Sequence, residues 1–371
     1  MTQSRFDRLN ASLHASDLDA VILNPGPTLT HLTGLRFHLM ERPVVLLFAK
    51  DQDPAIVLPE LELQKVASLP YRLQVFPYPE NPSEWDNAFR KATQALSLTQ
   101  SGGKRIGVDP RQLRLLEFRH VKVGAPEADY PDGSDVLSSL RLKKEKTEVE
   151  AMRRAVKIAQ DALEATIPSI EIGMTEKELS SELVMQLLKH GSEPEMPFAP
   201  IVSGGLNSAN PHAAPTERKL QAGDLLVIDW GATYDGYISD LTRTFAVGEV
   251  DDEYKKIHKI VQEANAAGRA AAQPGIPCAN VDKAARDVIE KYGFGKYFTH
   301  RTGHGIGMEG HEEPYIRADN MQLLEPGMAF TVEPGIYLPN RNGVRIEDNV
   351  VITEDGVDVL SDMPREIRVV G

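Results

Sequence analysis

The chain has 371 residues, 41% hydrophobic and 26% charged, with a formal net charge of −13. This is the composition of a globular protein long enough for two domains, and the negative charge disfavours nucleic acid as a partner because phosphate backbones are repelled. The single cysteine, Cys278, excludes an intramolecular disulfide and a cysteine-based zinc site. The polar start lacks the apolar segment of a signal peptide, and the longest apolar run, residues 44–49, is too short to span a bilayer. We therefore expect a cytoplasmic protein without a membrane partner.

Short β-rich segments alternate with helical patterns in residues 1–140, which predicts an α/β domain built in layers. The predicted helices lie at 60–69 and 83–96, and the predicted strands at 19–23, 44–48, 55–58, 73–76 and 105–109. A charged amphipathic helix is expected to begin at residue 140 and to mark the start of a second domain, residues 141–371. The basic residues at the start of this helix are expected to be solvated; they are Arg141, Lys143, Lys144 and Lys146.

The second domain contains an internal repeat, in which Gly173–Gly191 aligns with Gly275–Gly293. Each copy contains an amphipathic helix, the first with a Thr175/Glu178 capping box, and each follows a longer helical pattern. Downstream, each copy has the pattern His-x-x-Pro, then Leu-x-x-Gly, then an apolar strand with an acid. Because these matches come in the same order, we expect one α+β domain made of two similar halves related by a pseudo-two-fold axis.

The repeat places four carboxylates in equivalent positions. Asp229 and Glu333 end apolar strands, while Asp240 and Glu347 lie on the segments that return from them. Four anions in an apolar core are too costly unless cations neutralise them, and two divalent cations would balance the charge. The neutral imidazole of His304 would complete the ligand set. Taken alone, an acid at a strand end is usually a turn or cap residue, and a histidine among glycines is usually at the surface.

The predicted ligand set is rich in oxygen, which favours Mn²⁺, Co²⁺, Fe²⁺ or Mg²⁺ and permits Zn²⁺. We expect two divalent metal ions, with Mn²⁺ favoured. Two metals that share a water lower its pKa and present a hydroxide near neutral pH, so the site indicates a hydrolase.

Five stretches of the second domain together are similar to one known family. They are "PIVSGGLNSANPHAAP", "LVIDWGATYDGYISDLTRTF", "HRTGHGIGMEGHEEP", "FTVEPGIYLP" and "GVRIEDNVVIT". Residues 145–367 resemble the M24 metallopeptidase superfamily, which includes methionine aminopeptidase, aminopeptidase P and prolidase. The resemblance implies the pita-bread fold, and the order Asp, Asp, His, Glu, Glu matches the metal ligands of the family. Residues 1–140, most clearly "NPGPTLTHLTGL", resemble the N-terminal domain of the creatinase, prolidase and aminopeptidase P branch.

The resemblance implies cleavage of the bond between a first residue and proline by a metal-bridging hydroxide. By matching position, Asp240 and Glu347 would bridge both metals, Asp229 would bind one metal, and His304 and Glu333 would bind the other. We predict His212, His311, Glu333 and Arg345 as catalytic residues, and Tyr337, His300, Arg36 and His38 as substrate-binding residues.

The resemblance also implies a role for each of these residues. His212 would donate to the developing oxyanion, and Glu333 would carry a proton to the leaving proline nitrogen. His311 and Arg345 would line the pocket beyond the scissile bond, and Tyr337 would shape the proline pocket. Simpler alternatives stay open: Arg345 neutralises an acid, and His212 is a turn residue between prolines.

His300 is expected to support the site rather than to take part directly. Arg36 and His38 are candidates to cap the site of a dimer partner, because a homodimer is the usual state in the family. Tyr234 is expected to pack in the core.

Two enzyme functions compete on the sequence alone. A prolidase cleaves only Xaa-Pro dipeptides, whereas an aminopeptidase P accepts longer proline-containing peptides. The chain length and the short spacing between Glu333 and Glu347 favour the prolidase. A non-catalytic binding or scaffold relative is the third alternative, and the complete ligand set argues against it.

Overall fold

A computed structural model describes residues 2–99 and 103–371, with side chains from residue 5 onward. The chain divides into two compact units, Met1–Arg141 and Leu142–Gly371. None of the helices in the described parts of the chain has the length and apolar character that crossing a bilayer requires.

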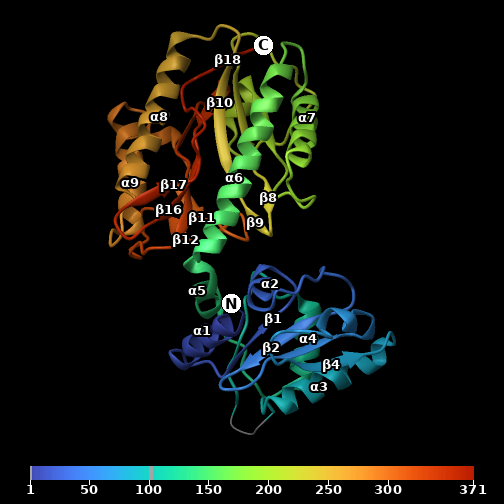
Figure 1. The fold of residues 1–371 in the computed structure, drawn as a ribbon. Coiled ribbons are helices and arrows are strands. Elements are labelled where there is room, and N and C mark those ends of the chain that lie inside the picture. Colours follow the sequence, from blue (N-terminus) through green and yellow to red (C-terminus); the bar gives the residue numbers. More distant parts are fainter. Residues whose placement is uncertain (1, 100–102) are drawn as a thin grey trace. The chain divides into compact units, whose positions relative to one another are not determined.

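The first unit is built on a five-stranded mixed sheet in the order β4-β3-β2-β1-β5 (Figure 1). All five predicted strands are present, each with a boundary within a few residues of the predicted one. The strands are β1 Ala20–Leu23, β2 Val45–Ala49, β3 Ala55–Pro59, β4 Gln74–Tyr78 and β5 Ile106–Gly107. The helices are α1 Thr2–His14, α2 Pro27–Thr33, α3 Trp85–Ala95, α4 Leu115–Gly124 and α5 Ser134–Leu142, with 3₁₀ turns at Glu60–Val66 and Pro82–Glu84.

Helices cover both faces of this sheet. Alternate residues of β1 and β2 point to opposite faces, as the two-residue period of a strand requires. Ile22 and Leu47 pack with Phe89 of α3, whereas Val21 and Leu46 pack with side chains of α1, α2 and α5. The α-helix expected at 60–69 is instead a 3₁₀ turn, because this segment is mostly exposed and gains little from packing.

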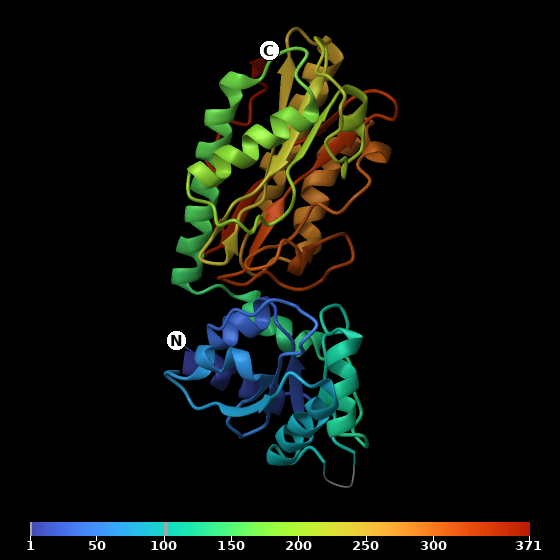
Figure 2. The same cartoon turned by 90° about the vertical axis from the view of Figure 1, so that its right-hand side faces the viewer.

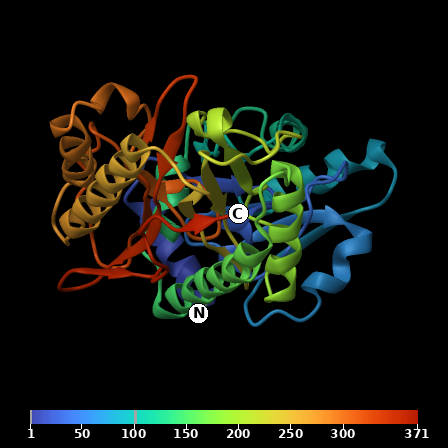
Figure 3. The same cartoon turned by 90° about the horizontal axis from the view of Figure 1, so that it is seen from above.

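The second unit contains two sheets flanked by two helix pairs. The pair α6/α7 (green) lies on one side of the strands and the pair α8/α9 (gold to orange) on the other (Figures 1 and 3). The helices are α6 Lys146–Thr166, α7 Glu176–Lys189, α8 Asp252–Ala271 and α9 Cys278–Lys291, with 3₁₀ turns at Ile167–Ser169, Gly205–Ala209 and Gly295–Tyr297. The predicted Thr175/Glu178 capping box opens α7.

The sheet orders show the internal repeat directly. One sheet runs β18-β10-β7-β6 and the other β12-β11-β13-β16-β17, so β6, β7 and β10 correspond to β11, β13 and β16. A small hairpin follows the middle strand in each half. The strands of the first half are β6 Ile201–Gly204, β7 Leu225–Trp230, β8 Thr233–Tyr234, β9 Tyr237–Ile238 and β10 Leu241–Val247. Those of the second are β11 Gly303–Gly305, β12 Glu312–Ile316, β13 Ala329–Val332, β14 Gly335–Tyr337, β15 Gly343–Arg345, β16 Asp348–Ile352 and β17 Val357–Val359, and β18 Val369–Val370 pairs with β10.

The repeated glycines have the same conformation in both halves. The four that bound the aligned segments, and the pair in Leu-x-x-Gly, all have positive φ, which glycine adopts without strain. They are Gly173, Gly191, Gly223, Gly275, Gly293 and Gly327. The repeat therefore reflects the same backbone turns in both halves as well as the same helix pattern.

The segment between the units differs from its prediction. The helix expected from residue 140 is interrupted, since α5 ends at Leu142 and α6 begins at Lys146. Lys144 is not solvated: its Nζ lies 2.6 Å from Glu312 Oε1, and both side chains are buried. The amide of Lys144 also donates to the carbonyl of Gly327, at 2.7 Å. The predicted basic surface is therefore wrong at Lys144.

Candidate metal centre

The four predicted carboxylates lie where the two sheets meet. Asp229 is in β7, Asp240 immediately precedes β10, Glu333 follows β13 and Glu347 precedes β16. An antiparallel bridge between Thr242 and Glu347 joins the sheets at this point, and Figure 2 shows the yellow strands of the first half beside the red strands of the second. The pseudo-two-fold repeat therefore brings acids from both halves to one place.

The imidazole of His304 faces these acids. Its Nε2 lies 3.3 Å from Glu333 Oε1 and 3.7 Å from Asp240 Oδ2. Its Nδ1 lies 3.1 Å from the carbonyl oxygen of Gly305, so the proton sits on Nδ1 and the Nε2 lone pair points to the carboxylates. This is the usual arrangement of a metal-binding histidine, whose other nitrogen donates to a backbone carbonyl. Ligand atoms of Asp240, His304 and Glu347 all lie within 4.8 Å of one another.

The glycines around His304 serve close packing. A Cβ on Gly303 would lie 1.8 Å from the carbonyl oxygen of Thr331, and one on Gly305 would lie 2.2 Å from that of Glu313. Glycine at both positions lets β11 approach its neighbours closely enough to hold His304 among the acids. This explains the two glycines that flank His304.

Burial dominates the electrostatics of the acids. It raises the pKa of Asp229, raises that of Glu333 to about 7, and raises those of Asp240 and Glu347 well above the ordinary range. Repulsion among the acids adds to this for Asp240, Glu333 and Glu347. Burial also lowers the pKa of His304, which is therefore neutral. Without cations the site disfavours its own ionised form, as expected for a site that binds positive charge.

The residues present fit divalent cations. Among the residues that the structure describes, the Oδ1 atom of Asp229 is buried without a hydrogen-bond partner, which is rare for a carboxylate oxygen unless an ion or a water binds it. Carboxylate oxygens and one neutral imidazole are the ligands that Mn²⁺, Co²⁺, Fe²⁺ and Zn²⁺ accept. Three of the five predicted ligands, Asp240, His304 and Glu347, form a group that could hold a metal ion, while Glu333 lies beside His304 and Asp229 is paired with Arg345.

A chain of hydrogen bonds runs from Asp229 away from the acids. Arg345 donates from Nη2 to Asp229 Oδ2 at 2.5 Å and from Nη1 to the Tyr337 hydroxyl at 2.9 Å. That hydroxyl lies 2.9 Å from Nε2 of His300, whose Nδ1 lies 2.7 Å from the carbonyl oxygen of Arg301. Burial lowers the pKa of His300 to about 4, so it is neutral and accepts from Tyr337. This series of hydrogen bonds orients Arg345 towards Asp229.

His212 and His311 lie at the edge of the acid cluster. The rings of His311 and His304 are 4.0 Å apart between centroids, and His311 is exposed. His212 is exposed and follows Pro211, whose carbonyl accepts from Arg345 at 3.2 Å. It is near enough to Asp229 to oppose, in small part, the rise in the pKa of that acid that burial causes.

A buried carboxylate holds the loop that carries His212. Glu176 at the start of α7 is fully buried and accepts from the amide of Gly204 at 2.8 Å and from the amide of Thr216 at 2.9 Å. It also accepts from the Thr216 hydroxyl at 2.6 Å and from Asn207 Nδ2 at 3.0 Å. Because these partners lie at both ends of the loop 204–216, Glu176 fixes the span on which His212 stands.

Two of the predicted residues belong to the first unit, and a third lies at the surface of the second. Arg36 and His38 are exposed residues of the first unit, after α2, whereas the acids belong to the second unit. Tyr234 was expected in the core, but it is 41% exposed because it sits at the tip of the β8–β9 hairpin.

Comparison with known proteins shows the family of the chain. The model of metallopeptidase family M24 matches residues 150–354, and that of the creatinase/prolidase N-terminal domain matches residues 5–143. The chain belongs to metallopeptidase family M24. It is thus a metal-dependent peptidase, and the predicted α+β fold with a creatinase-type N-terminal domain is confirmed.

Relatives within family M24 match over nearly their whole length. The Xaa-Pro dipeptidase of Lactobacillus helveticus is 33% identical over 365 residues, 98% of each chain. A crystal structure of a dipeptidase from Pyrococcus horikoshii OT3 is 35% identical, has a TM-score of 0.92, and covers 99% of this chain and 100% of that one. A crystal structure of a prolidase from Thermococcus sibiricus is 32% identical and also has a TM-score of 0.92. The match covers 100% of this chain and 99% of that one.

Two polar residues that were not predicted from the sequence contact the predicted ligands. Thr242 donates from its hydroxyl to Glu347 Oε2 at 2.6 Å. Asn349 accepts from the amide of Asp240 at 3.0 Å and donates to its carbonyl at 2.6 Å. The repeat contains a signal for both, since Thr242 follows Asp240 by two positions, as Asn349 follows Glu347.

Proposed function

We propose that this M24 metallopeptidase hydrolyses the Xaa-Pro bond of dipeptides at a centre of two divalent metal ions. The observation that supports it most is the buried group of four carboxylates around one neutral imidazole. The substrate class is supported by relatives named Xaa-Pro dipeptidase and prolidase that match nearly the whole chain.

The proposed ligands are Asp229, Asp240, His304, Glu333 and Glu347. Two bound cations would lower the pKa of a water and polarise the scissile carbonyl. Mn²⁺ is the proposed native metal, because oxygen ligands outnumber nitrogen; Co²⁺, Fe²⁺ and Zn²⁺ also suit the set.

The surrounding side chains have proposed roles in substrate binding and proton transfer. His212, exposed at the edge of the acids, donates to the substrate carbonyl, and His311, also exposed there, lines the pocket beyond the scissile bond. Glu333 is the proposed carrier of a proton to the leaving proline nitrogen, because its carboxylate lies within the acid cluster, with Oε1 3.3 Å from His304 Nε2. Tyr337 and His300 hold Arg345 in position and border the proline ring.

Activity measurements on metal-free protein test the proposal. The protein is treated with a chelator, supplied with Mn²⁺, Co²⁺ or Zn²⁺, and assayed on Ala-Pro, Ala-Pro-Ala and longer Xaa-Pro peptides. We expect Ala-Pro alone to be cleaved. Cleavage of the longer peptides would instead support an aminopeptidase P, and no metal-dependent cleavage would support a binding or scaffold protein.

A ligand variant and a matched control variant test the proposed ligand set. Asp240→Ala should reduce turnover to the level of chelated protein, because it removes a carboxylate that is proposed to bind the ions. Asp252→Ala, an exposed acid at the start of α8, should retain full activity. Activity in Asp240→Ala would contradict the proposed ligand set.

Further proposals concern the whole chain. We propose a domain boundary at residues 140/141, which agrees with two compact units that meet at residue 141.

We also propose a cytoplasmic homodimer in which Arg36 and His38 approach the partner's site. Light scattering on purified protein measures the oligomeric state, and Arg36→Ala should raise KM only if that approach occurs.

A further inference from the structure

Two proposed ligands leave the sheet at the end of the same ladder. Strands β13 and β16 pair as far as Val332 and Asp348, beyond which they separate into the β14–β15 hairpin. Glu333 and Glu347 are the residues at the point of separation. Their spacing therefore depends on whatever holds the backbone there.

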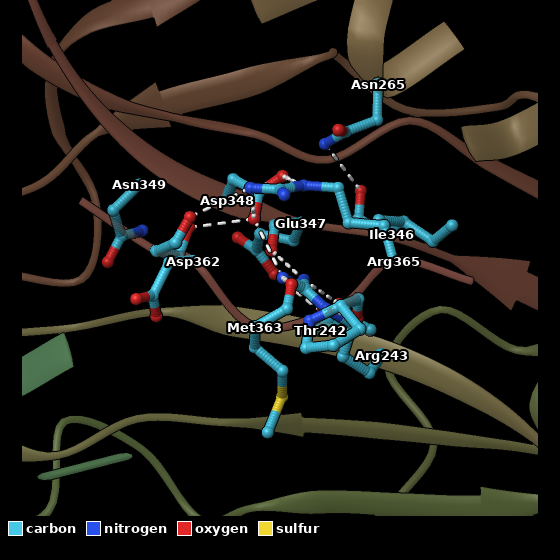
Figure 4. A network of polar contacts seen from close by, with 12 residues as sticks. Thr242, Arg243, Asn265, Ile346, Glu347, Asp348, Asn349, Asp362, Met363 and Arg365 are labelled. Carbon is cyan, nitrogen blue, oxygen red and sulfur yellow. Dashed lines mark hydrogen bonds and ion pairs between the residues drawn. The ribbon is translucent and has the colours of Figure 1, made fainter. Parts of the chain in front are cut away.

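Asn265 of α8 lies at this point. Its side chain is fully buried, and Nδ2 donates to the carbonyl of Val332 at 2.9 Å and to that of Ile346 at 3.3 Å. Each of these carbonyls belongs to the residue directly before a glutamate ligand. Figure 4 shows Asn265 reaching Ile346 beside Glu347.

The amide of Asn265 is itself held in orientation. Arg269, one turn along α8, donates from Nε to Asn265 Oδ1 at 2.8 Å. The same guanidinium lies 3.4 Å from Asp348 Oδ2, and Arg365 binds that carboxylate at 2.7 Å. Because an arginine has only donors, Asn265 must present its oxygen to Arg269 and its NH₂ group to both carbonyls.

We propose that Asn265 is a positioning residue for the metal centre, which sets the spacing of Glu333 and Glu347 through the carbonyls before them. A metal site tolerates only small displacements of its ligands. Mutating a residue that hydrogen-bonds to a ligand typically reduces metal affinity or activity by about 10–100-fold. The inference rests on the proposed two-metal centre.

The variant Asn265→Asp tests this role. It has nearly the same shape and keeps the oxygen that faces Arg269, but it replaces the donor that serves both carbonyls with an acceptor. Co²⁺ is titrated into chelator-treated protein, and both the affinity and the visible absorption spectrum of the ion are measured. We expect a loss of roughly 10–100-fold in affinity and an altered spectrum, in protein that remains folded by circular dichroism.

The control is the same substitution at another buried amide. Asn342→Asp changes a side chain whose oxygen accepts from Leu225, at the end of β7 away from Asp229. Its Co²⁺ affinity and spectrum should match those of the wild type. Wild-type affinity in folded Asn265→Asp would overturn the inference, whereas a wild-type protein that binds no Co²⁺ would refute the metal centre itself.

A second pair of variants tests the same role if Asn265→Asp does not fold. Arg269→Gln and Arg365→Gln each remove one cation from Asp348, but only Arg269 contacts Asn265. We expect Arg269→Gln to weaken Co²⁺ binding by about 3-fold or more, since the amide loses its orienting donor, and Arg365→Gln to have the smaller effect. An equal or larger loss in Arg365→Gln would overturn the inference.

Discussion

Arg345 and Asp229 form a buried ion pair inside the proposed metal centre. The Nη2 atom of Arg345 lies 2.5 Å from Oδ2 of Asp229, and both side chains are almost completely shielded from solvent. Burial alone would lower the pKa of Arg345, but Tyr337 and the surrounding carboxylates raise it well above its ordinary value. The guanidinium is therefore charged and neutralises part of the acid cluster before any metal binds.

Replacing Arg345 should destabilise the metal-free protein more than the metal-bound protein. In Arg345→Met, Asp229 stays buried without its partner, and breaking a buried pair in this way costs about 3–5 kcal/mol. Mn²⁺ should restore part of the loss, because the cation replaces the missing positive charge. Urea unfolding with chelator and with Mn²⁺ measures both values.

The control for this prediction lies in the same hairpin. Arg341 pairs with Glu253 at the surface, so Arg341→Met should cost only about 0–1 kcal/mol, with or without metal. Equal free energies of unfolding for the two chelated variants would contradict the importance of the Arg345–Asp229 pair.

The raised pKa of Glu333 predicts a pH-dependent stability of chelated protein. The folded pKa of about 7 exceeds the ordinary value of 4.5, so the stabilisation is present below pH 4.5 and is lost as the pH rises through 7. Relative to Glu333→Gln, the wild type should lose about 3 kcal/mol across this window. Urea unfolding at several pH values measures the difference, and parallel curves for the two proteins would contradict it.

Metal binding should release protons over the same range. Because Glu333 and its neighbours must ionise to bind cations, affinity for Mn²⁺ should increase from pH 5 to pH 7. Calorimetry in buffers of different ionisation enthalpy counts the released protons. The exposed-acid variant Glu325→Gln should release as many protons as the wild type, and Glu333→Gln should release fewer.

Glu176 should act on catalysis only through the His212 loop. His212→Ala should lower kcat by about 10²–10³-fold if it stabilises the oxyanion. Glu176→Gln introduces an amide NH₂ group among the donors of Gly204 and Thr216, so the loop should shift and kcat should fall.

A double-mutant cycle separates this effect from general destabilisation. In the His212→Ala background, Glu176→Gln should cause little further loss of kcat, because the residue that it positions is already absent. Additive losses of kcat would show that Glu176 has no specific link to His212.

The neighbours Lys143 and Lys144 should differ sharply in their contribution to stability. Lys144→Met leaves Glu312 buried without its cation and should cost about 3–5 kcal/mol, whereas the exposed Lys143–Glu325 pair should contribute about 0–1 kcal/mol. The double variant Lys144→Met/Glu312→Leu should recover much of the loss. Thermal unfolding of the three variants measures this, and similar losses for Lys143→Met and Lys144→Met would contradict the burial of the pair.

The positions of the buried acids could be predicted from sequence because the same pattern occurs in both halves of the repeat. An acid in one half, such as Asp240, points to its counterpart Glu347 in the other, and the surrounding apolar strands indicate burial. The five strands of the first unit were predictable for a different reason, because the residue pattern of a strand is local in the sequence. The exposed hairpin tip at Tyr234 was not, because a short apolar stretch does not reveal whether another element covers it.

The residues that support the site could not be found in this way. Glu176 looks like an ordinary acid in the first turn of a helix, Lys144 like one member of a basic cluster, and Asn265 like a polar residue on a helix surface. Each is buried only because a distant segment packs over it. Loop 204–216 covers Glu176, β12 lies beside Lys144, and the backbone at Val332 and Ile346 lies beside Asn265. Such long-range packing leaves no periodic pattern in the sequence.

The two look-alike halves divide the proposed ligands unequally. Asp229 and Asp240 belong to the first half, and His304, Glu333 and Glu347 to the second, with the Thr242–Glu347 bridge between them. A chain cut in the connection between β10 and α8 would thus yield two fragments, neither of which holds a full ligand set. Such fragments should reassociate more tightly when divalent ions are supplied, which would make metal availability a determinant of assembly.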